Sequence, residues 1–306
     1  MRALVTGASG FVGRHLVKSL LNEGHGVIAL LRPQSCTTFQ NENFQRIDID
    51  DWSEDALKHK LEEKDFDAVI HLAASGVDPS DRALQTLHEI NTKLPATLVS
   101  LAALRKAVMI GAGSSAEYHT PSAETPLKEN DRLEDEASYG TSKAQGGAEA
   151  IEAAVTQNVP MRHLRFFHIY GAGEAPHRLL PTLIHHAKTT ERIALSEGSQ
   201  QRDFLYVGDA VSAIITACHA LLSKKASGGR AVNVCTGQAT TVRAFTLTAT
   251  RLLNIDTARL GFGDLPLRPQ ENSYVVGDPA EIGFDLGWRA AYDLEAGLQA
   301  ALKDSI

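Results

Sequence analysis

Residues 4–13 read Leu4-Val5-Thr6-Gly7-Ala8-Ser9-Gly10-Phe11-Val12-Gly13, an apolar run followed by glycines three positions apart. The run is typical of a buried strand, and the apolar spacing after it indicates an amphipathic helix near 11–23. Glycine permits a tight turn and a close approach of the backbone to a pyrophosphate. The helix N-terminus adds free N–H groups and a partial positive charge. The stretch therefore predicts a strand–turn–helix unit that binds a dinucleotide.

Strands and helices alternate through the first half of the chain. Strands are expected at 3–6, 27–31, 46–49, 68–73, 107–111 and 162–167, and helices near 11–23, 54–63, 82–104 and 138–156. This alternation predicts an α/β Rossmann fold with a doubly wound parallel sheet. The second half is less regular, but residues 231–235 again have the pattern of a buried strand. We expect a nucleotide-binding domain of residues 1–166 and 208–236, and a smaller, discontinuous C-terminal substrate lobe of residues 167–207 and 237–306.

The overall charge and composition exclude several classes of protein. The 306 residues include 30 Lys and Arg against 37 Asp and Glu, and a net charge of −7 argues against sequence-independent nucleic-acid binding. No apolar run approaches the roughly 20 residues that a membrane helix needs, and the first residues do not have the pattern of a signal peptide. Cys36, Cys218 and Cys235 are far apart, which favours neither a disulfide framework nor a zinc site. We expect a cytoplasmic globular protein without a metal, a nucleic-acid partner or a membrane anchor.

The spacing Thr-Gly-x-x-Gly-x-x-Gly at residues 6–13 resembles the extended subfamily of the short-chain dehydrogenases/reductases. The resemblance implies a nicotinamide cofactor. It implies that Asp48 and Ile49 meet the adenine ring, and that Asn91 supports the architecture of the site. The cofactor contacts that it implies at the glycine turn and after the fourth strand are Gly7, Ser9, Gly10, Phe11, Val12, Gly13, Leu72, Ala73 and Ala74.

The end of the second strand bears on the choice of cofactor. Rossmann sites often place an acid there to bind the ribose 2′-hydroxyl, whereas this chain has Leu31 followed by Arg32. A cation suits a 2′-phosphate, and without a carboxylate there is no repulsion against it. The pattern favours NADP over NAD; the alternative is that Arg32 is a solvated surface residue.

Tyr139 and Lys143 are four residues apart and lie on one face of the helix expected at 138–156. A free tyrosine has a pKa of about 10, and a nearby ammonium group lowers that pKa. Such a tyrosine can exchange a proton with a carbonyl or hydroxyl group while the nicotinamide exchanges a hydride. The resemblance implies that both residues also contact the cofactor, Lys143 through the nicotinamide ribose.

Residues 113–118, GSSAEY, resemble the serine motif of the family. Its register selects Ser114 as the hydrogen-bond donor to the substrate oxygen, with Ser115 as the alternative. Related 4,6-dehydratases carry carboxylates directly after this serine, whereas here the next residues are Ser115 and Ala116. Glu117 is one position late and, on a strand, would face the other side. What remains is reduction of a 4-keto group or 4-epimerisation.

The second half of the chain carries further family signatures. Residues 165–171 resemble the segment R-x-x-N-x-Y-G, with His168 in place of the usual Asn. The resemblance implies that the helix opened by Arg178 borders the substrate, and that Arg202 and Arg268 bind its diphosphate. A planar guanidinium group binds phosphate oxygens in a bidentate manner. The expected substrate contacts are Ser114, Ser115, His168, Arg178, Arg202 and Arg268.

Together these patterns predict an NADPH-dependent reductase of a nucleoside-diphosphate 4-keto-6-deoxy sugar. Hydride reaches C4 and Tyr139 supplies the proton. The alternatives are a nucleotide-sugar 4-epimerase with tightly bound NAD and an NADPH reductase of a non-sugar carbonyl. A cofactor-sensing protein without catalysis is disfavoured because Ser114, Tyr139 and Lys143 are all present. The resemblance further implies a homodimer that pairs the helices near 82–104 and 138–156.

Overall fold

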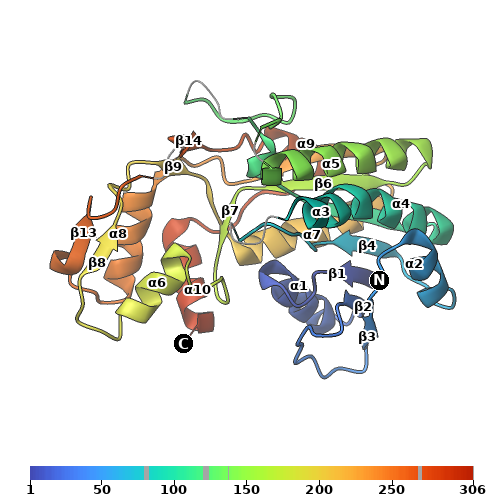
Figure 1. Cartoon of the computed structure of the whole chain (residues 1–306), viewed down its shortest axis with the longest axis horizontal. Coiled ribbons are helices and arrows are strands. Elements are labelled where there is room, and N and C mark those ends of the chain that lie inside the picture. Colours follow the sequence, from blue (N-terminus) through green and yellow to red (C-terminus); the bar gives the residue numbers. More distant parts are fainter. Residues whose placement is uncertain (79–82, 120–123, 137, 268–270, 306) are drawn as a thin grey trace.

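The computed structural model describes residues 1–78, 83–119, 124–136, 138–267 and 271–305. Figure 1 shows a larger body built on one sheet and a smaller lobe beside it. Every neighbouring pair of strands in the sheet is parallel, in the order β11-β6-β5-β4-β1-β2-β3. Their bounds are β1 (Arg2–Thr6), β2 (Gly26–Leu31), β3 (Phe44–Asp48), β4 (Ala68–His71), β5 (Val108–Ser114), β6 (Met161–Phe166) and β11 (Gly229–Val234). The predicted Rossmann fold is confirmed.

Helices cover both faces of the sheet, which explains the continuous apolar runs of its strands. In β1, Ala3 and Val5 belong to the core on one face and Leu4 to the core on the other. One face is covered by α1 (Phe11–Asn22), α7 (Val207–Leu222) and α9 (Ala280–Leu286). The other is covered by α2 (Glu54–Lys60), α4 (Leu94–Arg105) and α5 (Ser138–Thr156). The helix α9 lies in the range that we expected in the substrate lobe, but it packs against β11 and α7.

The helix expected at 82–104 is not a single regular helix, and its first residue lies outside the described residues. The structure has α3 (Leu84–Leu87), a π-helical segment η1 (His88–Lys93) and then α4. Pro95 has no N–H to donate to the carbonyl of Asn91 one turn earlier. A Cβ atom on Gly146 of α5 would lie 1.8 Å from that carbonyl oxygen. The change in helical geometry therefore coincides with a close contact between two helices.

In the described residues, the smaller lobe is built from two short strand pairs, one three-stranded sheet and four helical segments around its own apolar core. Its strands are β7 (His168–Tyr170) with β10 (Phe204–Tyr206), β8 (Ile193–Leu195) with β13 (Leu260–Phe262), and β9 (Gln201–Arg202) between β12 (Thr240–Thr241) and β14 (Tyr274–Val275). Its helices are α6 (Leu179–His186), α8 (Val242–Leu252), η3 (Thr257–Arg259) and α10 (Leu294–Ser305). Within the described part of the chain, no helix has the length and apolarity to span a bilayer.

The contact between α5 and η1 can be tested with a single methyl group. We expect Gly146→Ala to lower the free energy of unfolding by about 1–3 kcal/mol, because the new Cβ overlaps the Asn91 carbonyl. The matched control is Gly283→Ala in α9, where the nearest atom to the new Cβ is 3.8 Å away and the better helix propensity of alanine stabilises. Urea denaturation measures both. Equal stability of the two variants would contradict the prediction.

Candidate active site

The glycine turn after β1 has no room for side chains at two of its glycines. Gly7 has φ +72°, and a Cβ atom there would lie 2.6 Å from Ala73 N and from the carbonyl carbon of Leu72. A Cβ atom on Gly13 would lie 2.1 Å from Gly7 O, while Gly10 N donates to that same oxygen at 3.0 Å. The turn therefore closes against the end of β4. The start of α1 is left as a bare backbone surface that fits a pyrophosphate.

The ends of β2 and β3 carry the residues expected at the adenosine half of the cofactor. Arg32 is exposed, and Ile49 is buried with its N–H donating to Leu31 O at 2.7 Å. The Asp48 carboxylate forms an ion pair with Arg46, whose guanidinium group lies 2.7 Å away. The same guanidinium group donates to three carbonyls of the loop that follows β2. Sequence reasoning missed Arg46, although its place two residues before Asp48 on one strand face was a usable signal.

Ser114 ends β5 and begins a short 3₁₀ turn, η2 (Ser115–Glu117). Its Oγ accepts a hydrogen bond from Ala116 N at 3.1 Å, and its N–H donates to Glu117 Oε1 at 2.9 Å. Because Oγ already serves as an acceptor, the hydroxyl hydrogen is available for a substrate oxygen. A Cβ atom on Gly140 would lie 2.2 Å from Ala116 O, so the first turn of α5 lies directly on this turn.

Glu117 is fully buried beneath the turn and does not enter the site as an acid. His163 Nε2 donates to both carboxylate oxygens at 2.9 and 3.0 Å, and Arg165 Nε donates to Oε2 at 2.9 Å. Burial alone would raise the pKa of Glu117, but His163 and Arg165 together hold that pKa below its usual value. The two partners from β6 escaped sequence reasoning. A usable signal for His163 was the glycine at positions 113 and 147, because a Cβ atom at either position would lie 2.5 Å from His163 Nε2.

The helix α5 carries the expected tyrosine and lysine. Lys143 is buried and its Nζ donates to Ala112 O at 2.7 Å. Burial lowers the pKa of Lys143, and the negative charge of Glu117 opposes that shift. Tyr139 lies in the first turn and is half-buried, with its carbonyl accepting from Ser142 Oγ at 2.8 Å. Both residues therefore belong to the helix that packs on the Ser114 turn.

Asn91 connects three parts of the site through its buried side chain. Its amide exchanges two hydrogen bonds of 2.9 Å with the backbone of Ser75, and it donates to Ser142 Oγ at 3.1 Å. The loop after β4, the π-helical segment and α5 are thereby held together. The structure agrees with the supporting position that the resemblance implied for this residue.

His71 is a core residue at the end of β4 rather than part of a reactive group. Its Nδ1 lies 2.8 Å from Thr6 Oγ1 on the neighbouring strand. Burial, and then the charges of Lys143 and His163, lower the pKa of His71 to about 3, so the ring is neutral. The contact between His71 and Thr6 links β4 to β1, the strand that leads into the glycine turn.

Three of the expected substrate residues, His168, Arg178 and Arg202, lie near one another in the smaller lobe. Arg202 is buried, and its Nη2 lies 3.2 Å from Glu271 Oε1. His168 has a buried Nδ1 without a hydrogen-bond partner among the described residues. Burial and the charges of Arg202 and Arg178 lower the pKa of His168 to about 3. Arg178 is exposed at the start of α6. Two guanidinium groups therefore lie near a neutral histidine, and one of them is paired with Glu271.

The remaining expected residues have simple positions. Ser115 is half-buried in η2, and Leu72, Ala73 and Ala74 follow β4 beside the glycine turn. Arg268 lies outside the described residues. The glycine turn follows β1 and the Ser114 turn follows β5, so both lie at the carboxyl ends of the parallel strands, where ligands bind in folds of this class.

Comparisons with known proteins agree with this arrangement. The model of the NAD dependent epimerase/dehydratase family matches residues 3–235, so the chain belongs to that family. It is an enzyme of the extended short-chain dehydrogenase/reductase type.

Individual relatives cover almost the whole chain. UDP-glucose 4-epimerase from Mycolicibacterium smegmatis is 29% identical over 97% of this chain and 96% of its own. CDP-abequose synthase from Salmonella muenchen is 26% identical over 98% and 97%. The solved UDP-glucuronic acid 4-epimerase from Bacillus cereus, in complex with UDP-glucuronic acid and NAD, has a TM-score of 0.83 at 25% identity over 99% and 98%.

The buried carboxylate beneath Ser114 gives a prediction on stability. Glu117→Gln leaves Arg165 buried without its anion, so we expect a loss of about 3–5 kcal/mol at pH 7. The pKa of Glu117 lies below its unfolded value of about 4.3, so its contribution is present above that pH. This stabilisation is lost as the pH falls through the pKa of Glu117 in the folded protein. Below that pH, the free energies of unfolding of Glu117→Gln and the parent protein should become equal.

Chemical denaturation at pH 7 and at stepwise lower pH measures both effects. Glu54→Gln is the control, because it removes only an exposed ion pair with Lys58 and should leave stability unchanged. If Glu117→Gln were as stable as the control at pH 7, the buried network would not hold the turn.

Proposed function

We propose that the chain is an NADPH-dependent reductase of a nucleoside-diphosphate 4-keto-6-deoxy sugar. The observation that carries the proposal is the chemistry of the turn after Ser114. Its next two side chains are a hydroxyl and a methyl group, and its one carboxylate, Glu117, is buried against His163 and Arg165. Elimination of water from a sugar needs an additional acid and base, and this turn offers neither. One hydride transfer and one proton transfer remain.

The glycine turn suits the pyrophosphate of a nicotinamide dinucleotide. Without Cβ atoms, Gly7 and Gly13 let the turn pack closely, and α1 begins after Gly10 without a side-chain cap, so its first N–H groups can bind the anion. Arg32 is an exposed cation at the end of β2, and the acid nearest to it along the strand ends, Asp48, is paired with Arg46. This supports a 2′-phosphate and hence NADP(H). The bound cofactor would supply the hydride to C4 of the sugar.

Three side chains of this protein take part in the protonation of the carbonyl oxygen at C4. The Ser114 hydroxyl donates a hydrogen bond to it and polarises the carbonyl group. The Tyr139 hydroxyl gives its proton to the oxygen as hydride reaches the carbon, so the ketone becomes a secondary alcohol. The Lys143 ammonium group stabilises the phenolate that Tyr139 leaves behind, and its hydrogen bond to Ala112 O keeps it in place. Solvent then returns a proton to the tyrosine.

The smaller lobe would bind the nucleoside diphosphate. Arg202 is buried with its guanidinium group facing Glu271, and a diphosphate offers more charge and more acceptors than that single carboxylate. Arg268 would be the second ligand. His168 is neutral, so its unpartnered Nδ1 can meet a sugar hydroxyl. Arg178 would close the site at the edge of α6.

A 4-epimerase with tightly held NAD is the second candidate, and a specific observation favours it. A UDP-glucose 4-epimerase shares 29% identity over nearly the full length, and the solved 4-epimerase at 25% identity is a complex with NAD. The two candidates use the same Ser114, Tyr139 and Lys143. They differ in whether the cofactor leaves after each turnover.

Removal of the proton donor is the first test of the chemistry. We expect Tyr139→Phe to lower kcat about 10²- to 10⁴-fold, because the alkoxide at C4 loses its source of a proton. Binding of NADPH should be retained, since only the hydroxyl group is lost. Tyr292→Phe, at an exposed tyrosine on the surface of the lobe, is the matched control and should keep full activity. Undiminished turnover in Tyr139→Phe would rule out the proposed role.

The cofactor separates the two candidates. We expect freshly purified protein to release little nicotinamide nucleotide on denaturation and to bind NADPH more tightly than NADH. Arg32→Ala should weaken NADPH about 10- to 100-fold and leave NADH unchanged, because it removes a charge-assisted contact to the 2′-phosphate. Arg251→Ala, which removes an exposed ion pair on α8, is the control. Near-stoichiometric release of NAD, with no effect of Arg32→Ala, would favour the epimerase.

A further inference from the structure

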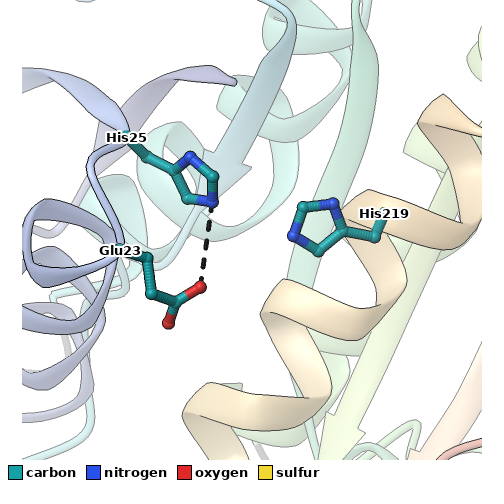
Figure 2. Close-up of side chains that lie close together, drawn as sticks. All are labelled: Glu23, His25 and His219. Carbon is teal, nitrogen blue, oxygen red and sulfur yellow. Dashed lines mark ion pairs between the residues drawn. The ribbon is translucent and has the colours of Figure 1, made fainter.

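Three side chains with metal-ligating atoms converge between α1 and α7. Figure 2 shows Glu23, His25 and His219, with the carboxylate and one imidazole from the segment after α1 and the other imidazole from the last turns of α7. One ligand atom from each residue lies within 4.8 Å of the others. The two rings are 5.7 Å apart between centroids. Glu23 and His25 are only two residues apart, but His219 is far from both in the sequence, so no motif predicts the cluster.

The backbone that presents Glu23 and His25 is held by the end of the helix. Gly24 adopts the left-handed conformation with φ +75°, and its N–H donates to Leu21 O at 3.1 Å. The N–H of His25 reaches back to Leu20 O at 2.8 Å. This pair of hydrogen bonds is the Schellman arrangement, in which a left-handed residue closes a helix. It fixes the positions from which both side chains leave the chain.

The ligand atoms are oriented as well as close. Ser19 Oγ donates to Glu23 Oε1 at 2.8 Å, which leaves Oε2 facing His25 Nε2 at 3.8 Å. Such a partner behind a ligand is the usual support of a protein metal site.

We propose that Glu23, His25 and His219 bind one divalent first-row transition-metal ion, with Zn²⁺ as the reference ion. Two imidazoles and a carboxylate are a common set for this class of ion. Bond lengths of about 2.0–2.2 Å require the ligand atoms to move closer together. Glu23 and His219 are exposed side chains that can make this movement. Water would complete the coordination.

A second group of potential ligands fits a metal less well. His119, Glu134 and Asp135 also lie close together. The Asp135 carboxylate accepts from Arg132 at 2.8 Å, and Glu134 Oε1 accepts from two backbone N–H groups at 3.0 and 2.9 Å. These oxygens would have to leave their partners before they could bind an ion. The group serves as an internal comparison for the test.

The proposed site lies away from the cofactor turn. His25 directly precedes β2, whereas Arg32 follows the other end of that strand. An ion here would join the C-terminal ends of α1 and α7, two helices that already pack together. Its role is structural, and it does not depend on the proposed reaction. Binding to the folded state alone would raise the thermal midpoint by mass action.

The experiment uses tag-free, chelator-treated full-length protein titrated with Zn²⁺ by calorimetry, and with Co²⁺ by visible absorption. We expect one saturable site, a rise in Tm with Zn²⁺, and an affinity that falls at least tenfold in His219→Ala. His219 is exposed, so the variant should fold as the parent does, which circular dichroism checks. Glu23→Gln should weaken binding in the same direction.

Two matched controls make the result decisive. His185→Ala alters one ring of another imidazole pair, with centroids 5.5 Å apart, and should leave zinc affinity unchanged. His119→Ala disables the comparison group and should also have no effect. Absence of saturable binding below about 1 mM Zn²⁺, equal affinity in His219→Ala and the parent, or loss of binding in either control would overturn the proposal.

Discussion

A buried carboxylate beneath the end of β5 organises the chemical centre of this protein. Glu117 accepts from the backbone of Ser114 and from two side chains of β6, His163 and Arg165. An anion in the core is costly unless every oxygen is paired, and here both are paired. The pairing fixes the turn that presents the Ser114 hydroxyl, and its charge favours the ammonium form of Lys143. One group therefore supports two of the three residues to which we assign the chemistry.

The same network extends across the sheet toward the smaller lobe. Arg165 also donates to the hydroxyl of Tyr118, which in turn donates to Asn233 on β11 at 2.5 Å. On the far side, Asp203 accepts from the backbone of Gly237 and Gly277 and joins the lobe to the strand ends. The Ser114 turn and the smaller lobe are thus joined to the ends of the sheet strands by buried polar contacts. This suits a reaction that requires fixed geometry between hydride, carbonyl and proton donor.

Local patterns predicted the elements that depend on near neighbours in the sequence. The strand and glycines of residues 4–13 are where the pattern puts them, and helix periodicity locates the helix of Tyr139 and Lys143. The π-helical segment was not predictable, because it depends on Gly146 of another helix meeting the Asn91 carbonyl. The missing N–H group at Pro95 indicates a change of helical geometry only when the contact between Asn91 and Gly146 is also known.

Charge pairs between residues distant in the sequence were the other features that sequence alone could not provide. The burial of Glu117 depends on His163 and Arg165, two residues whose alternation on β6 marks a face but not a partner. The convergence of Glu23, His25 and His219 requires the packing of α1 on α7. In each case the sequence shows the chemical groups, and the fold decides which of them meet.

In the proposed reaction, hydride passes from the cofactor to C4 of a nucleotide-linked keto sugar and stays in the product. This can be measured by turnover of nucleoside-diphosphate 4-keto-6-deoxy sugars with NADPH deuterated at nicotinamide C4, followed by mass and NMR analysis of the product. We expect one deuterium at C4 of the sugar and one NADP⁺ for each product molecule. Interconversion of C4 epimers without deuterium and without net oxidation of the cofactor would show that the enzyme is not a reductase.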